Sequence, residues 1–138
     1  MPDDPLAAAL GRIGDRWALL LVDALLDGPL RFGELQAAVG SIATNVLTQR
    51  LRHLEAESVV VARPYSERPA RYRYELTAAG RGLAGALRLL AQWGAEHATG
   101  GAPLLTHAAC GTPLEARWWC PTCARMVGDG EPDEPVFV

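Results

Sequence analysis

Two short helical segments joined by a tight turn, with two β-rich runs directly after them, constrain the fold of this chain most. The first segment, LRFGELQAAVG, closes at Gly40, and a second helix is predicted over residues 43–57. Because only a few residues separate them, the two helices are expected to form a helix-turn-helix. The runs VVVARPY and ARYRYELT, with SERP between them, predict a β-hairpin over residues 59–65 and 71–76 with Pro69 at the bend.

Further helices are predicted on both sides of this unit. Residues 6–27 carry apolar side chains at helical spacing, with a break at Gly14 and a new helix that begins at Asp15. After the hairpin, Thr77 is expected to cap a long helix over residues 77–97. A helix-turn-helix followed by a hairpin is the order of a winged helix. The predicted fold class is therefore mainly α with a β-hairpin wing, plus a small C-terminal β-ribbon appendage.

The second helix of the predicted helix-turn-helix has two distinct faces. Leu47, Leu51 and Leu54 recur at positions i, i+4 and i+7, so they are expected in the core. The opposite face and the hairpin are rich in side chains that read base edges or hold phosphates. The predicted DNA-binding residues are Thr44, Asn45, Thr48, Gln49, Arg50, Arg52, His53, Arg68, Arg71 and Arg73. For the helix alone, an ordinary solvated face is an equally good interpretation; the basic hairpin beside it favours DNA.

Charge is distributed unevenly along the chain. The formal net charge is -3, and all 13 basic residues are arginines. The forked guanidinium of arginine suits both phosphates and guanine edges. Residues 41–75 carry a net positive charge, whereas residues 104–138 carry a net negative charge. The middle of the chain is therefore the part predicted to meet a polyanion, and the overall negative charge argues against indiscriminate binding.

The sequence also argues against several classes of protein. No apolar run reaches membrane-spanning length, and the N-terminal MPDDPLAAAL lacks the basic start of a secretory signal. The chain has three cysteines, an odd number that does not suggest a disulfide framework. These features predict a cytoplasmic protein with reduced thiols and no membrane partner. No nucleophile and base stand together in the pattern, so an enzyme is not expected.

All three cysteines lie in one short window, HAACGTPLEARWWCPTC, near the C-terminus. His-x-x-Cys-Gly followed by Cys-Pro-x-Cys is typical of two knuckles that present four tetrahedral ligands to zinc. The predicted ligands of one structural Zn²⁺ are His107, Cys110, Cys120 and Cys123. Three other interpretations stay open: the last two cysteines form a redox pair, all three cysteines are ordinary reduced residues of a hairpin, or His107 is an ordinary surface or core residue and not a ligand.

The linker ATGGAP separates this window from the rest of the chain. We therefore predict a winged helix-turn-helix over residues 1–99, a zinc-ribbon-like extension over residues 100–128 and an acidic, Pro-rich tail over residues 129–138. Within the extension, Trp118 and Trp119 are expected on alternating faces of a strand, so that one of them packs inward.

Association of two copies of the chain is predicted from the long helix. Its Leu83, Leu87 and Leu90 form a stripe that so small a domain is expected to leave exposed. Leu6 and Leu10 of the first helical block are candidate partners for this stripe. The chain is therefore expected to form a homodimer.

Several motifs resemble those of one known family. From Leu6 to about His97 the chain resembles the HxlR family of winged-helix transcriptional regulators, which are relatives of the MarR type. The matching motifs are IGDRWALLL, GPLRFGELQ, LTQRLRHLE, PARYRYELTAAGRGL and QWG, in this order. The resemblance implies a dimeric regulator, commonly a repressor, that binds a near-palindromic DNA operator. It covers about two thirds of the chain and leaves the cysteine window outside.

The chain departs from the family pattern at three points. Ala43 stands where members often have the serine that caps the recognition helix, and Thr44 is a candidate to replace it. Ser58 stands where members tend to have glycine, so this helix end is expected to be shaped differently. Redox-sensing members carry a cysteine just before the first helix, where this chain reads DDPL. Their thiol switch is therefore not carried over.

Two functions from different classes are compatible with the sequence. The first is a transcriptional regulator that places its recognition helix in the major groove and its wing on the DNA backbone. The alternative is a winged-helix module that binds another protein and does not contact DNA; the acidic net charge favours it, whereas the wing arginines favour the regulator. The sequence does not name an operator, and a small-molecule effector stays open as a further partner.

Overall fold

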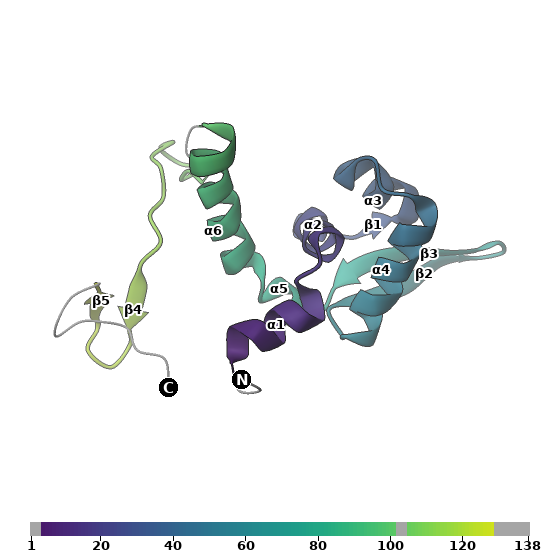
Figure 1. Cartoon of the computed structure of the whole chain (residues 1–138), viewed down its shortest axis with the longest axis horizontal. Coiled ribbons are helices and arrows are strands. Elements are labelled where there is room, and N and C mark those ends of the chain that lie inside the picture. Colours follow the sequence, from purple (N-terminus) through teal and green to yellow (C-terminus); the bar gives the residue numbers. More distant parts are fainter. Residues whose placement is uncertain (1–3, 102–104, 129–138) are drawn as a thin grey trace. The chain divides into compact units, whose positions relative to one another are not determined.

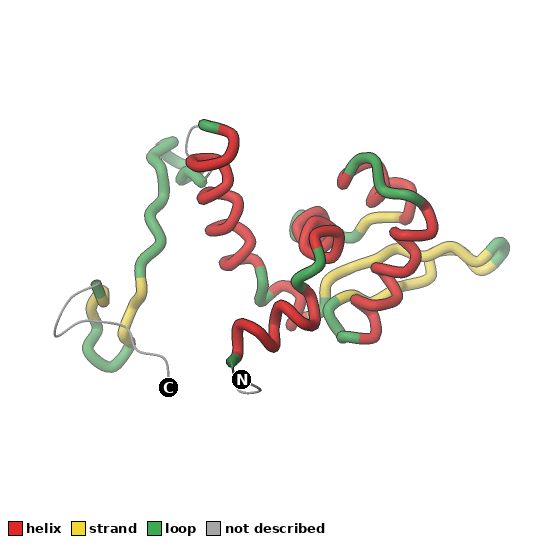
Figure 2. The backbone as a smooth tube through the Cα atoms, viewed as in Figure 1, coloured by secondary structure: helices red, strands yellow, loops and turns green. Residues whose placement is uncertain are grey.

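The computed structural model describes residues 4–101 and 105–128. The chain forms two compact units, over residues 1–87 and 88–138. Figure 1 labels the helices and strands of both units, and Figure 2 distinguishes them by colour. The first unit contains the predicted helix-turn-helix and hairpin, whereas the domain predicted over residues 1–99 extends into the second unit. The predicted acidic tail, residues 129–138, lies outside the described residues.

The first two helices begin at aspartates. α1 (Pro5–Ile13) follows Asp4, and α2 (Arg16–Leu25) follows Asp15. Each of these carboxylates accepts hydrogen bonds from amide groups of the first turn, which would otherwise have no partner in the helix. The predicted break at Gly14 is thereby confirmed.

The predicted helix-turn-helix consists of α3 (Phe32–Val39) and α4 (Thr44–Ala56). α3 ends at Gly40, whose φ of 66° lies in the left-handed region that favours glycine. The side-chain amide of Gln36 donates a hydrogen bond to the carbonyl oxygen of Ile42, 3.1 Å away. This contact ties α3 to the turn and so fixes the direction in which α4 leaves it.

The hairpin belongs to a three-stranded antiparallel sheet with the strand order β1-β3-β2. β2 (Val60–Glu67) and β3 (Ala70–Leu76) are joined by Arg68 and Pro69, so both strands reach closer to the tip than predicted. The third strand, β1 (Leu30–Arg31), was not predicted, because two residues show no periodicity. In Figure 1 the end of the hairpin projects well beyond α3 and α4.

The prediction of one continuous helix over residues 77–97 is wrong. The segment divides into α5 (Ala78–Arg81), α6 (Ala84–Gly94) and a π-helical turn (Ala95–Thr99), with a turn at residues 82–83 between the first two. The predicted cap at its start is confirmed, because the Thr77 hydroxyl oxygen accepts a hydrogen bond from an amide of α5.

Close packing of α5 on the sheet accounts for this break. A Cβ atom at Gly80 would overlap the carbonyl oxygen of Val59, so α5 lies directly against the start of β2. At the break, the amide of Leu83 donates to the carbonyl of Gly80 (3.1 Å), three residues back instead of four. The chain therefore tightens and changes direction before α6 begins.

The core of the first unit is formed by apolar side chains from the helices and the base of the sheet. Its buried members are Ala18, Leu21, Val22, Leu25, Leu35, Ile42, Leu47, Leu51, Leu54, Val59, Val60, Leu76 and Leu87. The three leucines predicted on the inner face of α4 are at most 2% exposed. The prediction that these three leucines form the inner face of a helix is thereby confirmed.

The leucine stripe expected to be exposed is only partly so. Leu87 is 8% exposed and belongs to the core of the first unit, and Leu83 is partly buried against that core. They are covered because the turn before α6 brings the start of that helix onto the core. Of the predicted stripe, only Leu90, at 55% exposure, is open.

The structure shows the local effect of two of the three departures from the family pattern, at the start and at the end of α4. Ala43 stands at the N-cap of α4 and provides no side-chain hydrogen bond, so the loss of a cap is confirmed. Thr44 does not replace it, because it is the first helical residue and its Oγ1 accepts a hydrogen bond from Gln36 (3.3 Å). Ser58 adopts a left-handed φ of 58°, so the expected difference in shape is wrong. Its carbonyl is held there by the Thr77 hydroxyl, 2.6 Å away.

The C-terminal part of the second unit contains short antiparallel pairs. β4 (Trp118–Cys120) pairs with β5 (Arg125–Val127), and an isolated bridge joins Thr106 to Pro113. Contrary to prediction, neither tryptophan of β4 packs inward, since Trp118 is 69% and Trp119 is 56% exposed. No residue in 105–128 is buried, so nothing in this segment provides a second layer.

Candidate nucleic-acid interface

α4 presents a polar face away from the core of the first unit. Asn45, Gln49 and Arg52 are exposed on it, and Thr48 is half-buried. The Thr48 hydroxyl donates to the carbonyl of Thr44 (2.9 Å), so its proton is engaged within the helix. The amide groups of Asn45 and Gln49 can both donate and accept hydrogen bonds, as the edges of bases require.

The two residues predicted at the flanks of this face contact other helices. Arg50 lies against the start of α2, with its Nε 2.9 Å from Asp15 Oδ1, although the angles do not suit a hydrogen bond. His53 Nε2 donates to the carbonyl oxygen of Arg12 (2.6 Å), and the Arg12 guanidinium in turn binds Glu57. The structure thus ties both side chains to the scaffold, whereas Arg52 remains on the open face.

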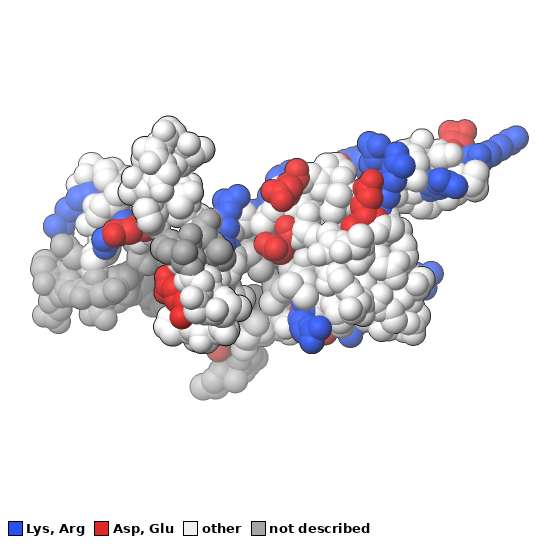
Figure 3. All heavy atoms as spheres, turned by 90° about the horizontal axis from the view of Figure 1, so that it is seen from above, with Lys and Arg blue, Asp and Glu red and all other residues white. Residues whose placement is uncertain are grey.

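The hairpin carries the other predicted arginines. Arg68 lies at its tip, and Arg71 and Arg73 lie on β3; all three are exposed. Arg63 on the facing strand is paired with Glu75, which cancels its charge. Figure 3 shows basic side chains gathered along the projecting end of the hairpin, where the acidic Glu67 ends β2. The hairpin is therefore a predominantly positive surface.

Tyr65 organises two of the basic side chains. The guanidinium carbon of Arg31 lies 4.6 Å from the centre of the Tyr65 ring, and that of Arg73 lies 5.5 Å from it. Cation–π attraction therefore holds two positive charges at one ring. Sequence reasoning missed Arg31 and Tyr65, because this contact joins β2 to β1, and β1 was not predicted.

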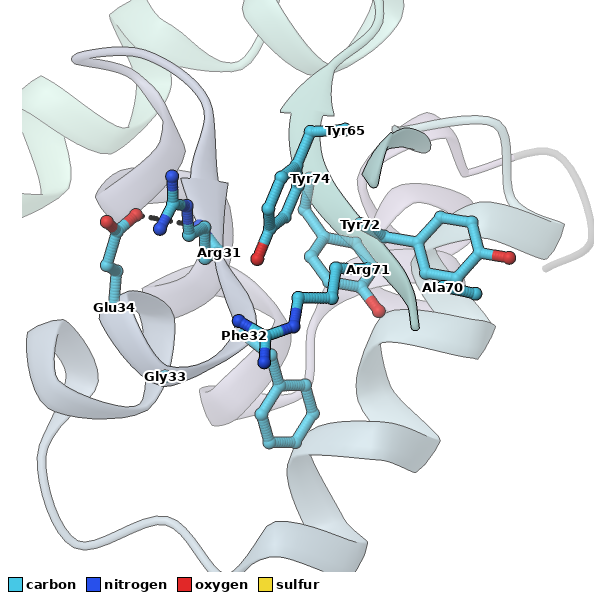
Figure 4. A pocket seen from close by; sticks show the side chains of 9 residues that line it. All are labelled: Arg31, Phe32, Gly33, Glu34, Tyr65, Ala70, Arg71, Tyr72 and Tyr74. Carbon is cyan, nitrogen blue, oxygen red and sulfur yellow. Dashed lines mark hydrogen bonds between the residues drawn. The ribbon is translucent and has the colours of Figure 1, made fainter. Parts of the chain in front are cut away.

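A pocket of about 570 Å³ opens between the start of α3 and the hairpin. It is lined by Arg31, Phe32, Gly33, Glu34, Tyr65, Ala70, Arg71, Tyr72 and Tyr74. In Figure 4 the side chain of Arg71 extends towards Phe32, whereas the ring of Tyr72 points away. Glu34 accepts a hydrogen bond from the backbone amide of Arg31 (2.8 Å). The pocket thus combines guanidinium and phenol groups, which are donors suited to an anionic oxygen.

Tyr74 lies where α4 meets the sheet. Burial raises the pKa of its phenol, and the negative charge of Glu55 on α4 raises this pKa further, while Arg52 acts in the opposite direction. The Tyr74 phenol therefore stays protonated and can donate a hydrogen bond.

The four predicted zinc ligands form two separate pairs. His107 Nδ1 lies 3.3 Å from Cys110 Sγ, and the Cys123 amide donates to Cys120 Sγ at 3.4 Å. Hydrogen bonding to Thr112 lowers the pKa of the Cys110 thiol, and bonding from Cys123 lowers that of Cys120. Across residues 4–101 and 105–128, no three histidine, cysteine or acidic side chains lie close enough to share a metal ion.

These elements define a winged helix-turn-helix protein whose exposed helix and basic hairpin belong to one compact unit. The chain belongs to the HxlR-like helix-turn-helix family, whose model matches residues 12–101. It is accordingly a transcriptional regulator of the HxlR and MarR type and not an enzyme, as its sequence predicts.

Relatives with similar sequences are helix-turn-helix regulators. The uncharacterized HTH-type transcriptional regulator Rv3095 of Mycobacterium tuberculosis is 36% identical over 127 residues, which are 90% of this chain and 80% of that protein. The HTH-type regulator YtcD of Bacillus subtilis is 39% identical over 90 residues, 65% of this chain and 71% of its own. The longer alignment reaches into the cysteine-bearing segment.

Solved structures share the fold of the winged helix. The redox regulator HypR in its oxidized form has a TM-score of 0.64 and 33% identity, and the match covers 68% of this chain and 97% of that chain. The reduced form of the transcriptional regulator YodB from B. subtilis has a TM-score of 0.60 and 29% identity, over 72% of this chain and 98% of its own.

Among the helices described here, none is long and apolar enough to cross a membrane.

Proposed function

We propose that this protein is a homodimeric repressor that binds a palindromic operator. In this proposal α4 enters the major groove, where Asn45 and Gln49 contact base edges, and the hairpin follows the backbone. The observation that carries the proposal is the presence of an open polar helix face and an exposed basic hairpin on one compact unit. Base contacts supply sequence preference, and phosphate contacts supply position and most of the non-specific affinity.

The phosphate-binding surface includes residues beyond the predicted set. Arg52 on α4, the exposed hairpin arginines and the pocket at the start of α3 together offer guanidinium groups to successive phosphates. Arg31 takes part because it is held beside Arg73 at the ring of Tyr65. In this proposal Arg50 and His53 do not contact DNA directly. They position the helix instead, because Arg50 holds α4 against α2 and His53 holds it against α1.

Substitutions on α4 and on the hairpin are expected to act differently on DNA binding. Gln49→Ala removes a base contact, so it should lower affinity for the operator by about 1 to 3 kcal/mol and change the preferred base at that position. Arg71→Ala removes a phosphate contact, so it should weaken all sequences about equally. Titration of fluorescent duplexes that carry single base changes measures both effects.

The outcome of that comparison is decisive for the assignment of α4. Operator affinity unchanged in both variants would show that α4 and the hairpin do not face DNA. The interaction-module alternative would then gain support, because it requires neither side chain.

Exposed apolar side chains support the homodimer. Leu6 and Leu10 on α1 are 66% and 53% exposed, and Leu89, Leu90 and Trp93 on α6 are between 51% and 59% exposed. Apolar groups of this size on successive turns of a helix are typical of a surface that a partner covers. A dimeric regulator that reads two half-sites one turn of B-DNA apart presents its two recognition helices about 34 Å apart.

Leu90→Asp is expected to convert the dimer to a monomer at micromolar concentration, because a charge would be placed in an apolar contact. Arg88→Asp is the matched control, since it puts the same residue on the opposite side of the same helix. Sedimentation equilibrium distinguishes the two. A monomeric unmodified protein, or a dimer that survives Leu90→Asp but not Arg88→Asp, would contradict this arrangement.

The whole proposal is tested on the DNA that flanks the protein's own promoter. The purified dimer should protect a palindromic segment of it from cleavage, with the two half-sites one helical turn apart. Equal protection of unrelated DNA at the same concentration would reject sequence-specific binding.

A further inference from the structure

The cysteine-bearing segment contains the same turn twice. His107, Cys110 and Gly111 of the first turn correspond to Cys120, Cys123 and Ala124 of the second, at one constant offset along the chain. The strand partners also correspond, since Thr106 pairs with Pro113 and Trp119 pairs with Met126. Each turn thus begins with one metal-binding side chain and places a second one three residues later.

The backbone of the two turns agrees as well. Gly111 and Ala124, each directly after a cysteine, adopt left-handed φ angles of 71° and 52°. Such geometry is unfavourable for alanine, so it indicates that the turn itself requires it. In the second turn the Cys123 amide points at Cys120 Sγ, 3.4 Å away. An amide directed at sulfur stabilises a thiolate, which is the form that binds a metal.

The distance within the first pair also suits a shared ion. Zn–S and Zn–N bonds of about 2.3 and 2.0 Å at a tetrahedral angle place the two ligand atoms about 3.5 Å apart. His107 Nδ1 and Cys110 Sγ are 3.3 Å apart. This pair therefore already has nearly the separation that tetrahedral coordination needs.

The segment lacks another source of stability. None of residues 105–128 is buried, and Leu114, Trp118, Trp119 and Met126 are each more than half exposed. So few residues without a core do not usually hold a fixed structure, unless a metal or a disulfide links them.

We propose that His107, Cys110, Cys120 and Cys123 of one chain bind a single Zn²⁺, which folds this segment into a small ribbon. One nitrogen and three sulfur ligands complete a tetrahedral shell, and thiolate-rich shells select zinc over magnesium or calcium. Because no position is left for water or substrate, the ion has a structural role. The proposal is independent of DNA binding, because none of the four ligands belongs to the winged helix.

Closure of the site requires the two turns to approach each other. The first turn ends at the hydrogen bond from the Leu114 amide to the carbonyl of Leu105 (2.8 Å), and β4 begins at Trp118. Residues 115–117 between them have no regular structure. Three residues are enough for a hairpin loop. A reversal there would place both turns at the same end, with their four ligands around one ion.

The test uses the full chain, purified in reducing buffer without chelators. Native mass spectrometry should show one zinc per protomer. Cys110→Ser and Cys120→Ser should each lose it, because each removes a ligand from a different turn. Thr122→Ser is the matched control within the second turn and should retain the ion.

His107 is tested by replacement with a different ligand. His107→Ala should weaken zinc binding, whereas His107→Cys should restore it, because cysteine supplies the fourth ligand. Replacement of zinc by Co²⁺ provides a second measure: the thiolate-to-metal absorption of His107→Cys should exceed that of the unmodified protein by about a third, as expected for four thiolates instead of three. His97→Ala controls for the loss of a histidine elsewhere.

Protease digestion shows whether the ion folds the segment. Removal of zinc should expose residues 105–128 to cleavage while the winged helix stays resistant. A metal-free protein whose segment resists protease, one zinc per two protomers, or zinc retained by Cys110→Ser would each overturn the proposal.

Discussion

Raising the salt concentration from about 50 to about 200 mM is expected to weaken operator binding by about three to five orders of magnitude. The reason is the release of counterions when arginines neutralise phosphates. If each protomer places Arg52, Arg68, Arg71 and Arg73 on phosphates, a dimer makes about eight such contacts. The measurement is the slope of the logarithm of the binding constant against the logarithm of the salt concentration.

The same slope tests which arginines are involved. Arg71→Ala should reduce its magnitude by about two for a dimer, since each phosphate contact contributes about 0.9. Arg117→Ala is the control, because Arg117 lies in the C-terminal segment and is paired with Glu115. A binding constant that hardly depends on salt would show that the basic hairpin does not contact the DNA backbone.

Gly80→Ala is expected to destabilise the winged helix by about 1 to 3 kcal/mol, the usual range for overpacking. The added Cβ would meet the carbonyl oxygen of Val59, which cannot move freely. This oxygen accepts hydrogen bonds from both the amide and the hydroxyl of Thr77, at 3.0 and 3.2 Å. Relief of the overlap would therefore also disturb Thr77, whose hydroxyl oxygen caps α5. Urea unfolding of the full chain measures the free energy.

Gly85→Ala is the matched control for this substitution. Gly85 lies in α6 with no heavy atom within 4 Å of the position that a Cβ would take. The same chemical change should therefore stabilise the protein by about 0.5 to 1 kcal/mol, through the helix propensity of alanine. Equal effects of the two substitutions would mean that α5 does not pack against β2 as described.

The elements that the sequence predicts well are those with a strong local signal. The leucines of α4 recur at helical spacing, and Asp15 and Thr77 are recognisable caps, so α2, α4 and α5 begin where expected. The break before α6 was missed because its cause is the contact of Gly80 with Val59, which lies far away in sequence. The spacing of apolar residues within one segment does not predict a contact with a distant segment.

The candidate DNA surface shows the same division. Its polar helix face follows from periodicity alone, and Gln49 and Arg52 lie where a helical wheel places them. The wheel does not show that Arg50 faces Asp15, nor that Arg31 and Arg73 meet at Tyr65. Both depend on how neighbouring elements pack, so they could be found only after the fold was known.

The contacts of Arg12 link the end of α1 to the end of α4. The Arg12 guanidinium donates hydrogen bonds to the side chain and the carbonyl oxygen of Glu57 at the end of α4, and the Arg12 carbonyl oxygen accepts a hydrogen bond from His53 Nε2. These contacts lie at the C-terminal end of α4, so a shift of α1 would act on the same helix that carries Asn45 and Gln49 nearer its other end. Coupling between two binding sites is reciprocal. If a partner bound at the exposed leucines of α1 changes the affinity of α4 for DNA, then DNA bound at α4 changes the affinity for that partner by the same factor.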